Sequence, residues 1–132
     1  MNFSTNVTFH PWIGKDYESG GCFKKRILVL GESHYCSPSV REQYCKQCSG
    51  CPKTCNGITE YTQDIVHESG YAGGAKRTFT KFFNVFTPPG CAIEDARDSI
   101  CFYNYVQESL GGPRHSPTEG QFKDSEPAFS KC

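Results

Sequence analysis

The sequence predicts an α/β protein, because two strand-like apolar segments enclose two segments with helical periodicity. Residues 27–31 and 100–106 are the strand-like segments, while residues 59–69 and 78–86 carry apolar side chains at helical spacing. A strand, helices and a second strand form a crossover connection, which places the two strands in one sheet. The expected fold class is therefore α/β.

The strand at residues 27–31 is the clearest element. Ile27-Leu28-Val29-Leu30-Gly31 is a continuous apolar run with β-branched residues, and it ends at a glycine. A continuous run, unlike an alternating one, is typical of a strand that is buried on both faces of a parallel sheet. We interpret the preceding Lys24-Lys25-Arg26 as a solvated edge.

Two helices are expected between the strands. The first carries Tyr61, Ile65 and Val66 on one stripe. The second has Thr78 as its expected N-cap and places four phenylalanines at i, i+3, i+4 and i+7. We interpret this phenylalanine stripe as core, with base stacking as the alternative. Its members are Phe79, Phe82, Phe83 and Phe86.

Shorter elements complete the expected chain. A polar helix is predicted near residues 93–98, and Trp12 with Ile13 is expected to pack on the sheet. Near the end of the sequence, Asp124 or Ser125 is the expected N-cap of a helix that has Pro127 in its first turn.

Length and composition narrow the class of protein. The 132 residues suit one domain, and 14 Lys and Arg balance 14 Asp and Glu, so nucleic-acid or membrane-surface binding could only be local. Ten Phe and seven Tyr predict an aromatic core. We expect a single domain over residues 1–132. A two-stranded sheet is only marginally stable on its own, so we expect the chain to be part of a larger domain or to complete its sheet by association. The oligomeric state stays open.

The protein is expected to be cytoplasmic and not bound to a membrane. The N-terminus lacks the basic and apolar regions of a signal peptide, and no stretch has the length of a membrane span. In a reducing compartment, a dense group of cysteines indicates metal binding more than disulfides, and nine cysteines suit a disulfide framework poorly.

A cysteine cluster lies in an expected insertion at residues 36–56. Its spacing, CxxCxxCxxxC, is that of bacterial ferredoxins, except that Asn56 replaces the usual proline. The expected cofactor is zinc or a 4Fe-4S cluster, and thiols without metal are the third alternative. A metal there would have a structural role, because it would stiffen a long connection. The expected metal ligands are Cys45, Cys48, Cys51 and Cys55.

The loop after the first strand brings polar side chains to the carboxyl end of that strand, where open α/β sheets place their ligand sites. Its sequence is Gly31-Glu32-Ser33-His34-Tyr35-Cys36. A serine-hydrolase elbow of the form GxSxG is not indicated, because Tyr35 occupies the second glycine position. The simpler alternative is a polar turn in which His34 is hydrogen-bonded to its neighbours.

Together with Phe102-Tyr103-Asn104-Tyr105-Val106-Gln107, this loop resembles the uracil-DNA glycosylase superfamily, and more closely its uncharacterised bacterial branch. The pocket loop of that superfamily has the form GQDPYH, with variants that begin GE. Gly31, Glu32 and Tyr35 match its first, second and fifth positions. The resemblance covers about residues 10–129, equivalent to the N-terminal half of the family domain. It implies a three-layer α/β/α fold with a central parallel sheet.

The resemblance also implies how a base would be bound. Asn104 matches the asparagine that reads a flipped base, and an amide can both donate and accept at the Watson–Crick edge. Tyr35 would crowd the C5 position of a pyrimidine and exclude thymine. Gly31 and Ser33 complete the expected substrate-binding set.

Two departures from the family concern catalysis. Ser33 stands where the best-known branch has an aspartate that positions water, so Glu32 or His34 is the expected catalytic group. The family's late HPSP-like loop has no counterpart, because Arg114-His115-Ser116-Pro117 follows the asparagine strand too early. We interpret His115 as part of a loop.

The leading hypothesis is a glycosylase-like domain that hydrolyses the N-glycosidic bond of a flipped, damaged or deaminated base in single- or double-stranded DNA. The first alternative is a small zinc or iron–sulfur module in which the cysteine run is the function. The second is an inactive remnant that binds nucleic acid or protein without chemistry.

Overall fold

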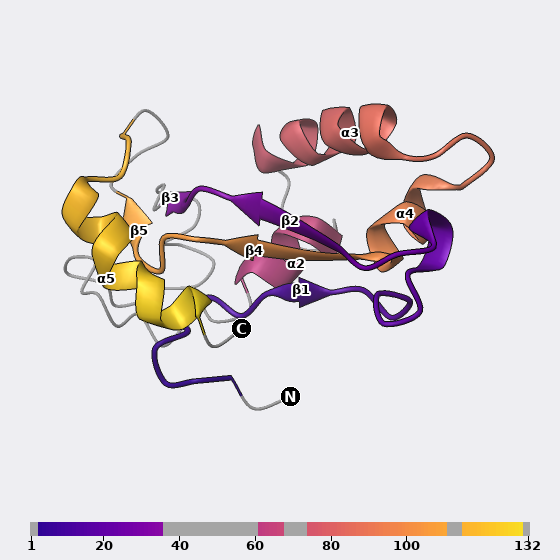
Figure 1. Ribbon diagram of the computed structural model, residues 1–132. Helices are drawn as coiled ribbons and strands as arrows, with labels where there is room; N and C mark the ends of the chain where they lie inside the picture. The colour runs from indigo at the N-terminus through magenta and orange to yellow at the C-terminus, as the bar shows by residue number, and fades with distance from the viewer. Residues whose placement is uncertain (1–2, 36–60, 68–73, 111–114, 131–132) are drawn as a thin grey trace. The chain divides into compact units, whose positions relative to one another are not determined.

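The computed structural model describes residues 3–35, 61–67, 74–110 and 115–130 (Figure 1). The chain divides into two compact units that alternate along the sequence. The first unit comprises Met1–His10, Gly31–Tyr61 and Asn104–Cys132, and the second comprises Pro11–Leu30 and Thr62–Tyr103. Each unit is described below by itself.

A three-stranded sheet forms the centre of the second unit. Its order is β1 (Trp12–Ile13), β4 (Ile100–Asn104) and β2 (Ile27–Gly31). β1 is antiparallel to β4, whereas the arrows of β2 and β4 run in the same direction in Figure 1. The α/β class is therefore confirmed, and the small sheet is mixed because Trp12 and Ile13 add an antiparallel strand.

The expected helices are present in the second unit. They are α2 (Tyr61–His67), α3 (Gly74–Phe86) and α4 (Ile93–Asp98), and a short 3-10 helix, η1 (Gly21–Phe23), precedes β2. No helix in the described ranges is both long and apolar enough to span a membrane.

The phenylalanine stripe of α3 packs in the core of the second unit, as predicted. Phe83 is buried, and Phe79 meets Phe102 of β4 edge-on with 5.0 Å between ring centroids. Phe82 stacks on Phe86 at 4.8 Å. Aromatic contacts of this kind stabilise a core beyond the area that they bury. The stripe is thus used for packing.

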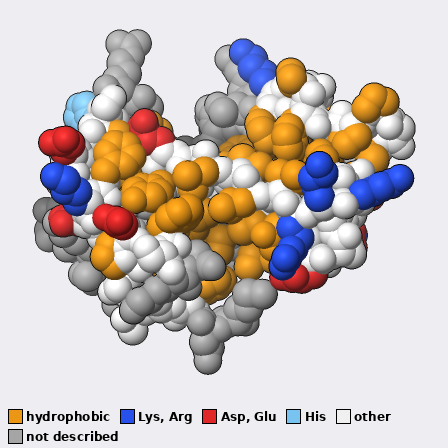
Figure 2. Space-filling model, viewed as in Figure 1, with side chains coloured by type: hydrophobic (Ala, Val, Ile, Leu, Met, Phe, Trp, Pro, Cys, Tyr) orange, Lys and Arg blue, Asp and Glu red, His pale blue; other side chains and the backbone are white. Residues whose placement is uncertain are grey.

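Two details of the second unit differ from the sequence predictions. β2 is not buried on both faces, because Leu28 and Leu30 are 49% and 50% exposed. Among the described strands it lies at the edge of the sheet, and Ile27 and Val29 are its core-facing residues. In Figure 2, apolar side chains are visible on the surface in the region of β2. α3 begins at Gly74, so Thr78 lies inside the helix and is not its N-cap.

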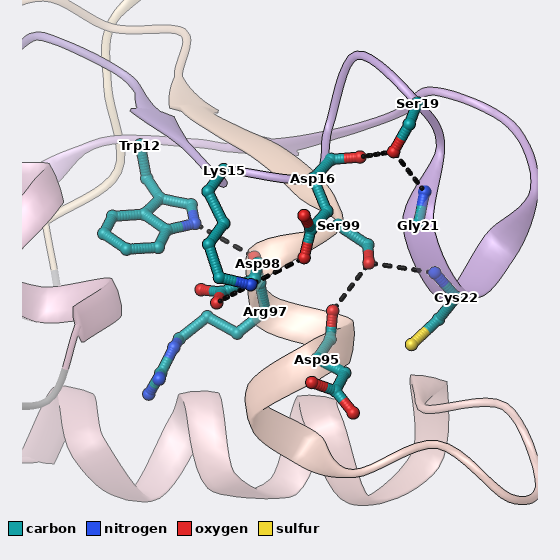
Figure 3. A network of polar contacts seen from close by, with 10 residues as sticks. All are labelled: Trp12, Lys15, Asp16, Ser19, Gly21, Cys22, Asp95, Arg97, Asp98 and Ser99. Carbon is teal, nitrogen blue, oxygen red and sulfur yellow. Dashed lines mark hydrogen bonds and ion pairs between the residues drawn. The ribbon is translucent and has the colours of Figure 1, made fainter.

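A polar network ties η1 to α4 (Figure 3). The Ser99 hydroxyl accepts the Cys22 N–H at 3.0 Å and donates to the Asp95 carbonyl at 2.6 Å. Gly21 makes this approach possible, because a Cβ there would lie 2.0 Å from the Ser99 hydroxyl oxygen. Its φ of +38° also favours glycine.

In its described residues, the first unit contains a two-stranded parallel sheet and one helix. β3 (His34–Tyr35) pairs with β5 (Ser109–Leu110), and the chain then forms α5 (Glu119–Phe129). Tyr105 contacts the rings of Phe122 and Phe129 on α5, at 5.9 and 5.2 Å between centroids. The buried side chains of the unit include Val7, Phe9, Val106, Leu110 and Ala128.

Gln107 joins the segments of the first unit through a buried amide. Its side-chain oxygen accepts the backbone N–H groups of Thr8 and Phe9, both at 2.9 Å. Its side-chain nitrogen donates to the Asn104 carbonyl at 2.7 Å, and its backbone N–H donates to the Ser125 hydroxyl at 3.0 Å. One residue therefore satisfies polar groups from the N-terminal segment, the end of β4 and α5.

The start of α5 was predicted in the wrong place. The N-cap is Thr118, whose side chain accepts the Gln121 N–H while the Gln121 side chain accepts the Thr118 N–H. This capping box satisfies two N–H groups that a helix start leaves unpaired. Ser125 therefore lies inside the helix, where its hydroxyl accepts the Gln107 N–H. Pro127 lies near the end of the helix.

We expect Gln107→Ala to lower the free energy of unfolding by about 3 kcal/mol, because the change removes the partner of a part-buried N–H of Thr8, a buried N–H of Phe9 and a buried carbonyl of Asn104. Urea unfolding followed by circular dichroism measures this. The matched control is Gln63→Ala, which removes one half-buried bond to the Pro11 carbonyl and should cost less than about 1 kcal/mol. Equal losses in the two variants would contradict the joining role of Gln107.

Candidate functional site

The structure brings the predicted loop next to the predicted asparagine. The Gly31 carbonyl accepts the Tyr105 N–H at 3.0 Å, and the Glu32 carbonyl accepts the Val106 N–H at 2.9 Å. Both donors directly follow Asn104, and both acceptors belong to a segment that is far away in the sequence. Within the first unit, the loop backbone therefore pairs with the two residues that follow Asn104.

The pairing continues beyond these two bonds. His34 is in register with Ser109, and Tyr35 with Leu110, in the parallel pair of β3 and β5. The whole loop from Gly31 to Tyr35 thus runs beside the segment that follows β4. Backbone pairing of this kind fixes the loop without using its side chains.

Asn104 is the buried amide of this site. It is 6% exposed, and its backbone carbonyl accepts the Gln107 side-chain nitrogen. Within the described residues, no hydrogen bond involves its side-chain amide. A buried amide can donate twice and accept twice, so Asn104 holds hydrogen-bonding capacity for a ligand.

Two serine hydroxyls in the same segments are buried. The Ser33 and Ser109 hydroxyl oxygens have no hydrogen-bond partner in the described part of the chain. Native proteins rarely leave buried hydroxyls unsatisfied unless a water or a ligand completes them. Ser109 was not among the predicted site residues, because a serine in a short strand carries no sequence signal.

His34 is buried among aromatic rings. Its ring centroid lies 4.6 Å from that of Phe9 and 4.5 Å from that of Tyr61. Burial lowers the pKa of His34 to about 3, because desolvation disfavours the imidazolium. The imidazole is therefore neutral at physiological pH. Glu32, by contrast, is exposed.

The other predicted functional residues are placed as follows. Tyr35 is half-buried in β3, and His115 is exposed. Cys45, Cys48, Cys51 and Cys55 lie outside the described residues. Within the described ranges, no group of three or more His, Cys, Asp or Glu side chains could hold a metal ion.

Comparison with protein-family models, with curated proteins and with solved structures finds no match for this chain.

We expect stability to fall on acidification because of His34. The unfolded chain binds a proton near pH 6.5, whereas folded His34 binds one only near pH 3, so protons favour unfolding between these values. The free energy of unfolding should lose about 2 kcal/mol between pH 7 and pH 5 through this group. Urea midpoints at both pH values measure it.

His34→Asn should flatten this pH dependence, and His115→Asn should leave it unchanged, because His115 is exposed. If His34→Asn keeps the wild-type difference between pH 7 and pH 5, the buried neutral imidazole is not its source.

Proposed function

We propose that this protein is a DNA glycosylase-like hydrolase that binds a flipped base between the Gly31–Tyr35 loop and Asn104. The observation that carries the proposal is the pair of backbone bonds from Gly31 and Glu32 to Tyr105 and Val106, which hold the loop beside Asn104. The two segments that resemble motifs of the uracil-DNA glycosylase superfamily are therefore paired through their backbones. The proposed ligand is single- or double-stranded DNA that carries a deaminated or damaged base.

Asn104 has the chemistry for reading a base. A pyrimidine such as uracil presents a carbonyl and an N–H on its Watson–Crick edge, so its reader must donate and accept from one group. The Asn104 amide can both donate and accept, and it has no hydrogen bond to a described residue. Its burial strengthens selection, because a base with the wrong pattern would leave buried polar groups unpaired.

Glu32 is the proposed group for water activation. It directly follows Gly31, is exposed, and has its own backbone fixed by Val106. A carboxylate that is held near the sugar could orient water and stabilise an oxocarbenium-like transition state. His34 suits a positioning role instead, because its pKa near 3 leaves the imidazole a weak base.

Tyr35 and Ser33 complete the proposed site. The half-buried Tyr35 would contact the C5 edge of a pyrimidine, and the unpartnered Ser33 hydroxyl could bond a base carbonyl or a water. The three-layer α/β/α arrangement of the family remains part of this proposal, with β2 and β4 as two of its parallel strands.

The test is base release from uracil-containing oligonucleotides, single- and double-stranded, by the wild type and by Asn104→Ala. We expect uracil release from the wild type and at least about a 100-fold loss in the variant, because the base-reading amide is removed. The matched control is Asn84→Ala, an exposed residue of α3, which should keep wild-type release.

Circular dichroism of each variant checks the fold. If folded wild-type protein releases no uracil, the proposed reaction is wrong. If Asn104→Ala and Asn84→Ala release uracil equally, Asn104 is not the base reader.

We also propose that the cysteine run binds zinc or a 4Fe-4S cluster. The alternative function is a small metal-binding module in which this run is the functional site. Protein purified without oxygen should contain bound zinc, or bound iron with visible absorption, and Cys48→Ser should lower that content because one ligand is lost. Elemental analysis of both proteins measures it, with Cys101→Ser as the control. Metal-free wild-type protein would favour simple thiols.

A further inference from the structure

The exposed leucines of β2 have no role in the proposed base site. β2 lies at the edge of the described three-stranded sheet, and its Leu28 and Leu30 side chains are 49% and 50% exposed. The strand contains no proline and no charged residue, which are common means of keeping an edge strand from pairing with another chain. Among the described strands, β2 therefore presents an unprotected apolar edge.

The backbone of β2 also faces outward at these leucines. The Gly31 carbonyl accepts the Tyr105 N–H at 3.0 Å, so the backbone groups of Gly31 point toward the segment that continues β4. Successive residues of a strand direct their N–H and C=O groups to opposite sides of it. Leu28 and Leu30 therefore direct theirs away from β4, where a further strand could bond them.

Exposure alternates along the segment that contains β2. Arg26, Leu28, Leu30 and Glu32 are exposed, whereas the residues between them are half-buried. Side chains that alternate in this way project from one face of an extended segment. The order on this face is basic, apolar, apolar, acidic. A second copy of the segment that runs in the opposite direction is therefore complementary to the first.

We propose that two copies of this chain associate through antiparallel pairing of β2 with β2, with Val29 of both copies at the two-fold axis. Leu28 then lies opposite Leu30 of the second copy, and Arg26 lies opposite Glu32 of the second copy. In this register leucine meets leucine and each charge meets its opposite. A shift of two residues in either direction places a charge opposite a leucine.

Charge and symmetry favour a second copy over an unrelated strand. The occupant needs an acidic side chain opposite Arg26 and a basic one opposite Glu32, with two apolar side chains between them, and the reversed β2 segment has this order. Two-fold interfaces between identical surfaces are the commonest in soluble oligomers. Arg26 also lies 3.6 Å from Glu18 within the chain, but these side chains are 66% and 67% exposed, so that ion pair is weak.

The test is the mass of the full chain, measured by sedimentation velocity over a range of concentrations. Because a five-residue strand gives a small interface, we expect a monomer–dimer equilibrium with a micromolar Kd. Leu28→Lys should raise the Kd at least about ten-fold, since a lysine on an edge strand opposes pairing. The matched control is Val85→Lys at an 88% exposed position of α3, which should keep the wild-type Kd.

A charge exchange tests the register. Arg26→Glu places carboxylates opposite each other at both ends of the paired strands, and Glu32→Arg places guanidinium groups there, so each should raise the Kd at least about ten-fold. The double variant restores opposite charges and should return the Kd to within about three-fold of the wild type. Glu18→Gln removes only the ion pair within the chain and should leave the Kd unchanged.

Three results would overturn the proposal. The first is wild-type protein that stays monomeric at every concentration, which needs no variant to fold. The second is an equal Kd for Leu28→Lys and Val85→Lys. The third is a double charge variant that dimerises no better than the single variants. Circular dichroism checks the fold of each variant. Because the measured quantity is mass, the result does not depend on whether the protein releases uracil.

Discussion

The first unit depends on one buried amide. Thr8 and Phe9 arrive from the N-terminal segment with backbone N–H groups that need acceptors, and Asn104 ends β4 with a carbonyl that needs a donor. Gln107 supplies both from a single side chain. Because unpaired buried backbone groups are costly, this arrangement fixes the path of the chain on both sides of Gln107. The position of Asn104 in the candidate site is a consequence of it.

Elements that local sequence determines could be predicted, whereas contacts that depend on distant residues could not. β2, α4 and the phenylalanine face of α3 were predictable because periodicity and local breakers determine them. The pairing of β3 with β5 was not, since each strand has two residues and takes its stability from a distant partner. Gln107 gave no signal either, because an amide that joins backbone groups looks like any polar residue in the sequence.

The candidate site shows both outcomes. Gly31 and Asn104 were singled out from motif type and order, and the backbone bonds join the Gly31–Glu32 segment to the two residues that follow Asn104. The start of α5 was missed although its signal was local, because Thr118 and Gln121 form a capping box that precedes a weakly apolar segment. The expected burial of Leu28 and Leu30 failed since a continuous apolar run does not reveal whether its strand lies at the centre or the edge of a sheet.

Burial separates the two residues that the sequence offered as catalytic groups. An imidazole whose pKa is near 3 accepts a proton poorly at neutral pH, and imidazolium formation between Phe9 and Tyr61 would place an unsolvated charge against two rings. His34 instead gives the loop a rigid, neutral anchor in β3. Glu32 lies two residues earlier, with its backbone held by Val106 and its side chain exposed to water. Backbone pairing therefore fixes the point from which the Glu32 side chain extends into solvent, whereas burial keeps the His34 imidazole neutral.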